Sequence, residues 1–433
     1  MKYIIFVFLF FCCFKILCNK GVNKFIWLMI GMLMINSLYS PIIKTNSHLT
    51  LASFYLISLF TDNTFKSDLK QYPLKNISII ICFIYFIIAL FTEWQPLWKS
   101  LYNAFLDYII SFFMLFVGYH AIKTPQEYDK VIKVLIPIVL ISSIYGLICF
   151  ILKDNPYNKI VGISDVGIDY NSFDAIRGYR ISGFSNTSNP HAHILTIGSF
   201  IILNRKINKI SIFIALLSLM NLFLSDSRAP IADLAILCFV YFILSKNLIK
   251  NVLHISIIIL LLLLIPGITN ILIHTISNIN DVFSAQGENE ISGSSMALRF
   301  LQFEKGLEFF THKPIFGHGF GYYEECIYEK GTDNEGLWGM ESYLLWLMVE
   351  MGFLMIIASF LFYKILLCSI LKYKECKFYK IPLSISIMLI TYLLLNRPSD
   401  IYEYTLPFIG LCLKMLKLYK YNKNSPQYNT ALN

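Results

Sequence analysis

The sequence predicts an all-α, polytopic membrane protein with about 12–13 transmembrane helices and two long loops on one face. Of its 433 residues, 56% are hydrophobic and only 15% are charged, and the mean hydropathy is +0.62. Apolar runs such as 79–90 and 257–264 recur along the whole chain, which is more than one globular core needs. Lysines gather in the short segments between these runs. Helices are expected because a helix satisfies its own backbone hydrogen bonds in hydrocarbon.

The apolar segments are the candidate spans. They lie near 3–18, 23–39, 47–61, 75–93, 101–121, 131–152, 190–203, 208–224, 229–245, 251–273, 341–370, 381–396 and 402–418. The first is similar to the apolar region of a signal peptide, but Cys12-Cys13-Phe14-Lys15 is a poor cleavage site. We interpret it as an uncleaved span or an interfacial helix. If it crosses, the N-terminus is outside; if it does not, both ends are cytoplasmic.

Basic residues orient these spans, because short loops rich in Lys and Arg face the cytoplasm. The clusters are Lys20 with Lys24, Lys66 with Lys70, Arg205–Lys209, Lys246 with Lys250, Lys372–Lys380 and Lys414–Lys423. The net charge of +9 therefore reflects orientation, and no nucleic-acid partner is expected. The predicted order is N-terminal spans (1–152), a first outside loop (153–189), central spans (190–273), a large outside loop (274–340), C-terminal spans (341–418) and a cytoplasmic tail (419–433).

The cysteines predict neither a disulfide framework nor a metal site. Most of the 10 lie in apolar runs or near cytoplasmic ends, and only Cys326 falls in a long loop. No CxxC pair, zinc-ligand spacing or D-x-D motif occurs. We therefore expect neither a metal nor a cofactor.

Arginines in three separate segments mark the predicted site. Arg177 and Arg180 end the first outside loop, Arg228 lies in a short outside turn, and Arg299 lies in the second loop. Guanidinium groups suit the geometry of phosphate, so their convergence on one face predicts a site for a phosphate-bearing substrate. Each segment also has a plainer interpretation: a helix cap with solvated arginines, an ion pair of Arg228 with Asp226, or a surface helix.

The second outside loop contains an amphipathic helix, 295–310, that we expect to lie flat at the membrane surface as a lid. Its apolar stripe is Leu298, Leu301, Phe303, Leu307 and Phe310, with Arg299, Gln302 and Lys305 opposite; Lys305 is a candidate substrate contact. Pro314 should end the helix, and Gly317, Gly319 and Gly321 should allow close backbone approach. A lone G-x-G-x-G is weak evidence for phosphate binding, and the lack of a preceding strand excludes a dinucleotide fold.

A carboxylate stands where the chain re-enters the membrane. Glu341 opens the span 341–370 and is a candidate general base for a sugar hydroxyl, although acids are also common at helix starts. His318 is the alternative base. Nearby Trp338 offers a stacking surface for a sugar, and Arg397, in another outside turn, is expected to complete the anionic site.

Four motifs together resemble the bacterial O-antigen polymerase and O-antigen ligase family of membrane glycosyltransferases. They are R-x-SGF-x(4)-NP at 180–190, S-x-SRA at 225–229, R-x(4)-EKGLEFFTHKPIFGHGFG at 299–321 and YLLWLMVEMGF at 343–353. The resemblance covers about 175–371. It implies that Arg180, Arg228 and Arg299 bind an undecaprenyl-diphosphate-linked glycan. Ligases of this family generally carry His-Asn where this chain has Glu341-Ser342, which favours a polymerase.

The resemblance implies an inverting, metal-independent glycosyltransferase of lipopolysaccharide biosynthesis at the periplasmic face of the inner membrane. Its substrates would be lipid-linked oligosaccharides, and its partners would be membrane lipid and a chain-length regulator protein. An O-antigen ligase, which moves glycan onto lipid A core, is the alternative enzyme. A lipid-linked oligosaccharide transporter is the alternative of another class, although repeated halves and charges near the midplane, which are typical of transporters, are not evident.

Overall fold

The computed structural model describes residues 2–35, 39–40, 45–108, 112–161, 179–185, 187–205, 207–225, 227–244, 296–323, 342–396 and 401–422. This part of the chain is helical apart from one small antiparallel ribbon, in which Tyr39 pairs with Asn46 and Ser40 with Thr45. The predicted all-α class is therefore confirmed. The predicted span 251–273 lies outside the described residues.

The helices of the first half are α1 (Lys2–Cys18), α2 (Val22–Met34), α3 (Ser47–Leu59), α4 (Phe65–Gln71), α5 (Lys75–Leu90), α6 (Leu97–Tyr108), α7 (Met114–His120), α8 (Pro125–Leu152) and α9 (Pro156–Val161). The start of α8 shows how sequence sets such a boundary. Thr124 and Glu127 form a capping box, each bonding the other's backbone N–H, and Pro125 occupies the first helical position.

The second half contains α11 (Ser188–Arg205), α12 (Lys209–Leu224), α13 (Arg228–Ile243), α17 (Met296–His312), α18 (Tyr343–Trp346), a π-helix η5 (Leu347–Met351), α19 (Gly352–Leu371), a 3₁₀ turn η6 (Lys377–Tyr379), α20 (Lys380–Leu395) and α21 (Ile401–Asn422). Apart from 251–273, each predicted span coincides with helix. The span 101–121 corresponds to two helices, α6 and α7.

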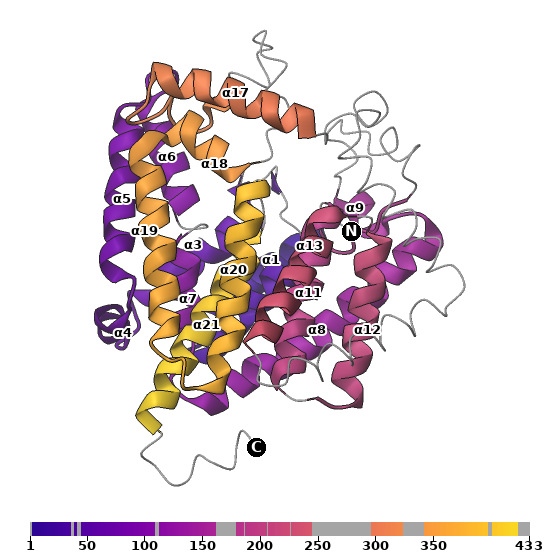
Figure 1. Cartoon of the computed structure of the whole chain (residues 1–433). Helices are drawn as coiled ribbons and strands as arrows, with labels where there is room; N and C mark the ends of the chain where they lie inside the picture. Colours follow the sequence, from indigo (N-terminus) through magenta and orange to yellow (C-terminus); the bar gives the residue numbers. More distant parts are fainter. Residues whose placement is uncertain are drawn as a thin grey trace.

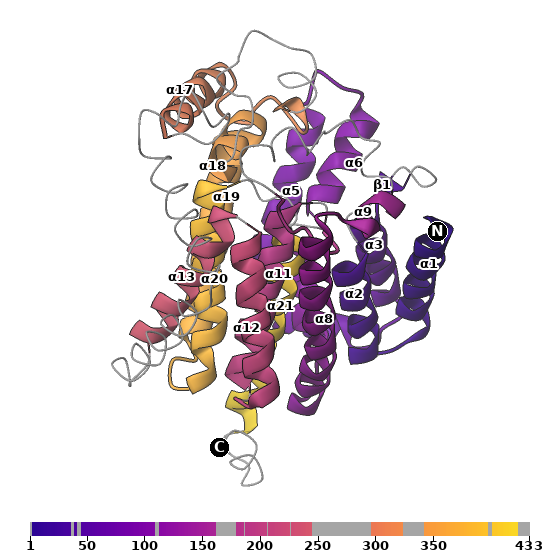
Figure 2. The same cartoon turned by 90° about the vertical axis from the view of Figure 1, so that its right-hand side faces the viewer.

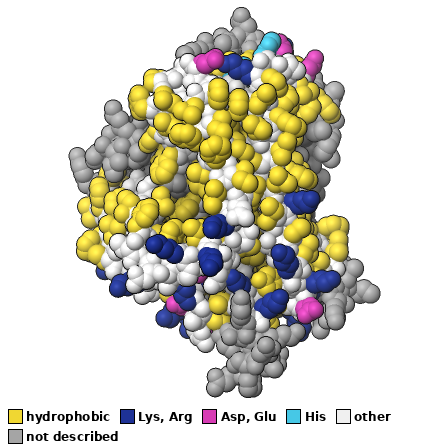
Figure 3. Space-filling model, turned by 90° about the vertical axis from the view of Figure 1, so that its left-hand side faces the viewer, with side chains coloured by type: hydrophobic (Ala, Val, Ile, Leu, Met, Phe, Trp, Pro, Cys, Tyr) yellow, Lys and Arg dark blue, Asp and Glu magenta, His cyan; other side chains and the backbone are white. Residues whose placement is uncertain are grey.

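Most helices run along one axis, while α17 lies across one end of the bundle and the C-terminus lies at the other (Figures 1 and 2). We call these the α17 end and the lysine-rich end. On the face shown in Figure 3, apolar side chains cover the middle, and Lys and Arg gather towards the lysine-rich end. An apolar band above a cationic rim is the surface expected of a membrane protein.

Helix lengths limit how many spans are evident. Three stretches are long and apolar enough to cross a bilayer: Pro125–Leu152, Tyr343–Leu371 and Lys377–Leu394. The pair α4 and α5, bent by 99°, would make a fourth. Five further apolar helices have 10–17 residues, among them α1, α2 and α3, against the roughly 20 residues that a perpendicular crossing needs. The described helices therefore give three or four candidate spans, against the 12–13 spans that we expected.

The first apolar run is part of the bundle. Helix α1 stands beside α2 and packs against α2 and α3 (Figure 2). Its Leu9, Cys12 and Ile16 are buried in the main hydrophobic core. This packing favours the uncleaved span over the separate interfacial helix.

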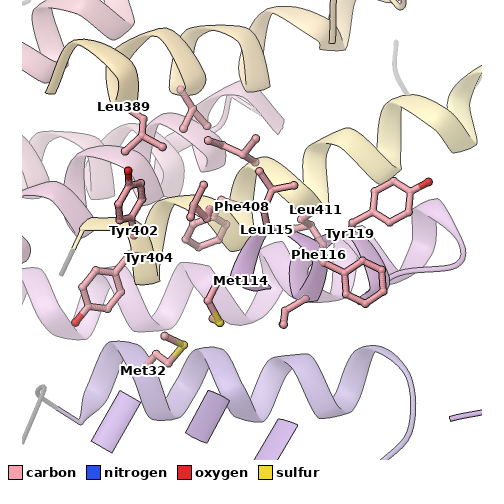
Figure 4. Close-up of a cluster of buried hydrophobic side chains, with 14 of the residues drawn as sticks. Met32, Met114, Leu115, Phe116, Tyr119, Leu389, Tyr402, Tyr404, Phe408 and Leu411 are labelled. Carbon is pink, nitrogen blue, oxygen red and sulfur yellow. The ribbon is translucent and has the colours of Figure 1, made fainter. Parts of the chain in front are cut away.

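The bundle is tightest where α7 crosses α21 (Figure 4). A Cβ added at Gly118 would lie 1.9 Å from the carbonyl oxygen of Pro407, and one at Gly410 would lie 2.0 Å from that of Leu115. Small residues let helix backbones approach closely, which is how helices associate in hydrocarbon. Around this crossing Met114, Phe408 and other apolar side chains interdigitate (Figure 4).

Some lysines of the predicted cytoplasmic clusters are buried in an ionic network. The ammonium of Lys414 lies 2.7 Å from Oδ1 of Asp68, and both side chains are about 6% exposed. The other oxygen of Asp68 contacts Lys123 and lies 2.8 Å from Nδ1 of His120. Such a network joins α4, α7 and α21 at the lysine-rich end.

Thiol labelling tests the orientation of the two ends. Phe300→Cys, at an exposed position of α17, should react with an impermeant maleimide added to intact spheroplasts. Lys372→Cys, at the lysine-rich end, should react only after permeabilisation. Both variants are placed in a background whose native cysteines are serine. Labelling of position 300 only from the cytoplasm would overturn the orientation.

Candidate functional site

Arg180 is held against the turn that precedes Arg228. Its Nε donates to the carbonyl oxygen of Ser225 (3.1 Å), and its Nη2 donates to Oγ of Ser227 (2.9 Å). Ser227 is the residue before Arg228, which begins α13, and its hydroxyl donates to Ser188 at the start of α11 (2.8 Å). The first two arginine segments, 45 residues apart in sequence, therefore meet at the α17 end.

The loop that carries Arg180 is held by side chains from α8 and from the segment that follows α8. Asn155 donates to the hydroxyl of Ser182 (2.8 Å) and to the carbonyl oxygen of Gly183 (2.7 Å). Tyr145 of α8 donates to Asn155 (3.0 Å), and its ring stacks on Phe184 at 4.4 Å. These contacts fix the backbone that follows Arg180, and such preorganisation would lower the entropic cost of binding an anion there.

Two buried histidines of α11 lie beneath this turn, and sequence analysis did not single them out. Nε2 of His191 lies 3.2 Å from Oδ1 of Asn221 on α12. Nδ1 of His193 lies 2.9 Å from Oδ2 of Asp233 on α13. All four side chains are at most 2% exposed. The available signal was the presence of ionisable residues inside apolar spans, which are generally functional in membrane proteins.

Helix α17 is confirmed as a helix that ends before Pro314, and its packed face includes Gln302 and Gly306, which lie outside the apolar stripe. Gln302 is buried, and a Cβ on Gly306 would meet Leu345 of α18 at 3.0 Å. The stripe residues Leu301, Phe303 and Leu307 are 40–44% exposed. Helix α17 lies across the end of the bundle at which α11 and α13 begin (Figure 1). The backbone of Arg299 is therefore at the same end as Arg180.

The glycine-rich segment after α17 packs against the backbone of another segment of the protein. Gly317, Gly319 and Gly321 all have positive φ, a conformation that glycine adopts readily. The N–H of Gly319 donates to the carbonyl oxygen of Glu350 (2.8 Å), and a Cβ on Gly317 would lie 2.3 Å from the Glu350 backbone. The close approach is therefore to the π-helix η5.

Glu350 completes this docking with its side chain. Its carboxylate accepts the backbone N–H groups of Gly321 and Tyr323, both at 2.9 Å, and is 1% exposed. π-Helical turns inside α-helices often accompany functional sites, and here the turn presents a carboxylate to the loop. Glu350 lies within the predicted span 341–370, and no functional role was expected for it.

Replacing Glu350 with Gln tests this docking. Gln keeps one acceptor oxygen but turns an NH₂ group towards a backbone N–H, so a charge-assisted bond is lost and a buried donor is left unpaired. We expect a loss of about 1.5–3 kcal/mol in unfolding free energy, measured as a lower thermal midpoint of the purified protein in detergent. Glu308→Gln, which alters the exposed pair with Lys305, is the control and should leave the midpoint unchanged. Equal midpoints for wild type and Glu350→Gln would contradict this account.

His318 is half-buried within the same loop. Its Nε2 donates to the carbonyl oxygen of Phe309 (3.0 Å), and its ring stacks on Tyr322 at 4.4 Å. Burial lowers the pKa of His318 below its usual value, which favours the neutral ring at pH 7. With Nε2 carrying the proton, Nδ1 holds the lone pair of a potential base.

The other predicted site residues are described only in part. Lys305 is exposed and pairs with Glu308 at 2.9 Å on the same helix, an interaction that water screens strongly. For Arg228 and Arg299 the structure describes the backbone, at the starts of α13 and α17. Four predicted residues lie outside the described residues: Glu341, Arg177, Trp338 and Arg397. Within the described ranges no three His, Cys, Asp or Glu side chains are grouped to hold a metal ion.

Residues 213–360 match the protein family described as O-antigen ligase. This range contains the α12–α13 turn, α17, the glycine-rich segment and η5. No curated protein matches the sequence.

Proposed function

We propose that this chain, whose residues 213–360 match the O-antigen ligase family, is the polymerase of a surface polysaccharide. It transfers glycan from an undecaprenyl-diphosphate donor to a lipid-linked acceptor at the periplasmic face of the inner membrane. The observation that carries this proposal is the junction of Arg180 with the turn before Arg228, two arginine segments that meet at the α17 end.

The chemistry requires stabilisation of a diphosphate leaving group. The acceptor hydroxyl attacks the anomeric carbon of the donor sugar, the bond from that carbon to the phosphate oxygen breaks, and the configuration inverts. The electron pair of that bond remains on undecaprenyl diphosphate. Guanidinium groups already fixed by protein contacts, as Arg180 is, stabilise this charge without having to reorganise during the reaction.

The proton of the acceptor hydroxyl needs a base. Glu341 is proposed for this role because it opens the span that continues into α18, and because ligases carry histidine at the matching position. His318 is the second candidate. The attack itself needs no metal, since the arginines supply the positive charge next to the diphosphate.

Ligase activity is the second candidate, because the matched family is described by that activity. The Glu341-Ser342 pair favours polymerase. Lipopolysaccharide from a deletion strain, separated on a gel, distinguishes them. Loss of a polymerase should leave core bearing one repeat unit, and loss of a ligase should leave bare core. An unchanged ladder of long chains would contradict both activities.

A further inference from the structure

An acid–base pair is buried between α11 and α13. Nδ1 of His193 and Oδ2 of Asp233 lie 2.9 Å apart, and the two residues are 1% and 2% exposed. The atoms are at ion-pair distance but are not aligned for a hydrogen bond, and Nε2 of His193 has no hydrogen-bond partner among the described residues. The imidazole also meets the ring of Tyr392 on α20 edge-on at 4.7 Å. The pair therefore joins three helices.

This pair lies directly beneath the anchor of Arg180. Helices α11 and α13 begin together, joined by the hydrogen bond from Ser227 to Ser188. His193 and Asp233 each lie five residues beyond the start of their helix, which is about 8 Å further along at 1.5 Å per residue. The same two helices are thus connected at the arginine turn and again below it.

Fold stability does not account for the pair. Removing two ionisable groups from water costs several kcal/mol each, and their attraction offsets this only when the geometry is excellent and the remaining polar atoms are bonded. Here the geometry is imperfect, and no described residue bonds Nε2 of His193. Two apolar side chains of similar volume would hold α11 and α13 together at least as well.

We propose that His193 and Asp233 are positioning residues for the anion site. Their attraction fixes the rotation of α13 relative to α11, and therefore the position of the backbone that carries Arg228 at the start of α13. Arg180 is bonded to the turn that precedes it, so the pair positions the turn that both arginine segments share. This role rests on the proposed function, since it concerns the site for the donor diphosphate.

The test uses the purified full-length protein reconstituted in vesicles. The double variant His193→Leu/Asp233→Leu removes both charges together, so it avoids the unpaired buried charge that either single variant would leave. We expect its thermal midpoint to equal or exceed that of wild type. We expect its kcat/KM for the lipid-linked donor to fall roughly tenfold or more, because misplacing a contact to the diphosphate by about 1 Å is costly.

Two further variants complete the design. Asp233→Asn keeps an oxygen facing the imidazole and should recover part of the donor affinity. His48→Leu is the matched control, because His48 is a fully buried histidine of α3 that contacts the carbonyl oxygen of Ile35 at 3.0 Å and the hydroxyl of Tyr404 on α21. It should leave the donor kcat/KM unchanged even if it lowers the thermal midpoint.

A direct binding measurement separates this inference from the proposed function. If wild type transfers no glycan, the proposed function fails, but stabilisation of the protein by undecaprenyl diphosphate still reports the anion site. Weaker stabilisation of the double variant than of wild type supports the positioning role. Equal stabilisation by undecaprenyl diphosphate, or a wild-type kcat/KM for the donor, would overturn it.

Discussion

Replacing Arg180, Arg228 or Arg299 with alanine should reduce glycan polymerisation by about 10²–10³-fold each, the range found when one donor to a developing oxyanion is removed. The reason is that charge develops on the diphosphate oxygens as the glycosidic bond breaks. Lysine replacements should rescue poorly, because an ammonium group cannot reproduce the two parallel hydrogen bonds of a guanidinium group. Transfer rates are measured with purified variants at saturating donor, and immunoblots establish equal amounts in the membrane.

Arg205 provides the matched control. It pairs with Asp129 through two hydrogen bonds, at 2.6 and 2.7 Å, at the lysine-rich end. Arg205→Ala removes the same side chain far from the proposed site and should retain polymerisation. Full activity in any two of the three alanine variants would rule out a convergent arginine site.

Replacing Glu341 with Gln should lower kcat by about 10²–10⁴-fold, the usual contribution of general base catalysis. The amide keeps the size and polarity of the carboxylate, so the donor KM should change little. Glu341→Asp should retain a fraction of the activity, because the carboxylate remains but is withdrawn by one methylene group. Steady-state kinetics of the purified variants separate the two parameters.

His318→Ala tests the competing base and should be milder than Glu341→Gln. The dependence on pH gives an independent criterion. If His318 accepts the proton, activity is lost as the pH falls through its pKa, which burial places below the usual histidine value. An inactive His318→Ala beside an active Glu341→Gln would move the chemistry into the glycine-rich segment.

Local features of the fold were predictable from sequence because they depend on neighbouring residues. Apolar runs predicted the helices, Pro314 predicted the end of α17, and the three glycines predicted a close backbone approach, which Gly317 makes to Glu350. The packed face of α17 was not predictable in this way. An amphipathic stripe does not show which side of a helix packs against protein, because the apolar side can also face lipid. Gly306, which has no side chain, lets α17 approach Leu345 of α18 closely.

Contacts between residues far apart in the sequence could not be predicted, because they depend on how the helices pack. His193 and Asp233 are 40 residues apart, and only the packing of α11 against α13 brings them together. Glu350 is hidden in an apolar run whose composition predicts a span, while its role depends on a loop about 30 residues earlier. By contrast, the proximity of Arg180 to the turn before Arg228 followed from topology, since both segments were expected on the same face.

The most direct test of the central claim is a reconstituted reaction. Vesicles contain the purified protein and an undecaprenyl-diphosphate-linked repeat unit as the sole glycan. Our account predicts lipid-linked products of several repeat units, with one undecaprenyl diphosphate released for each bond formed. A repeat unit that stays unextended, and is transferred only when lipid A core is added, would contradict it.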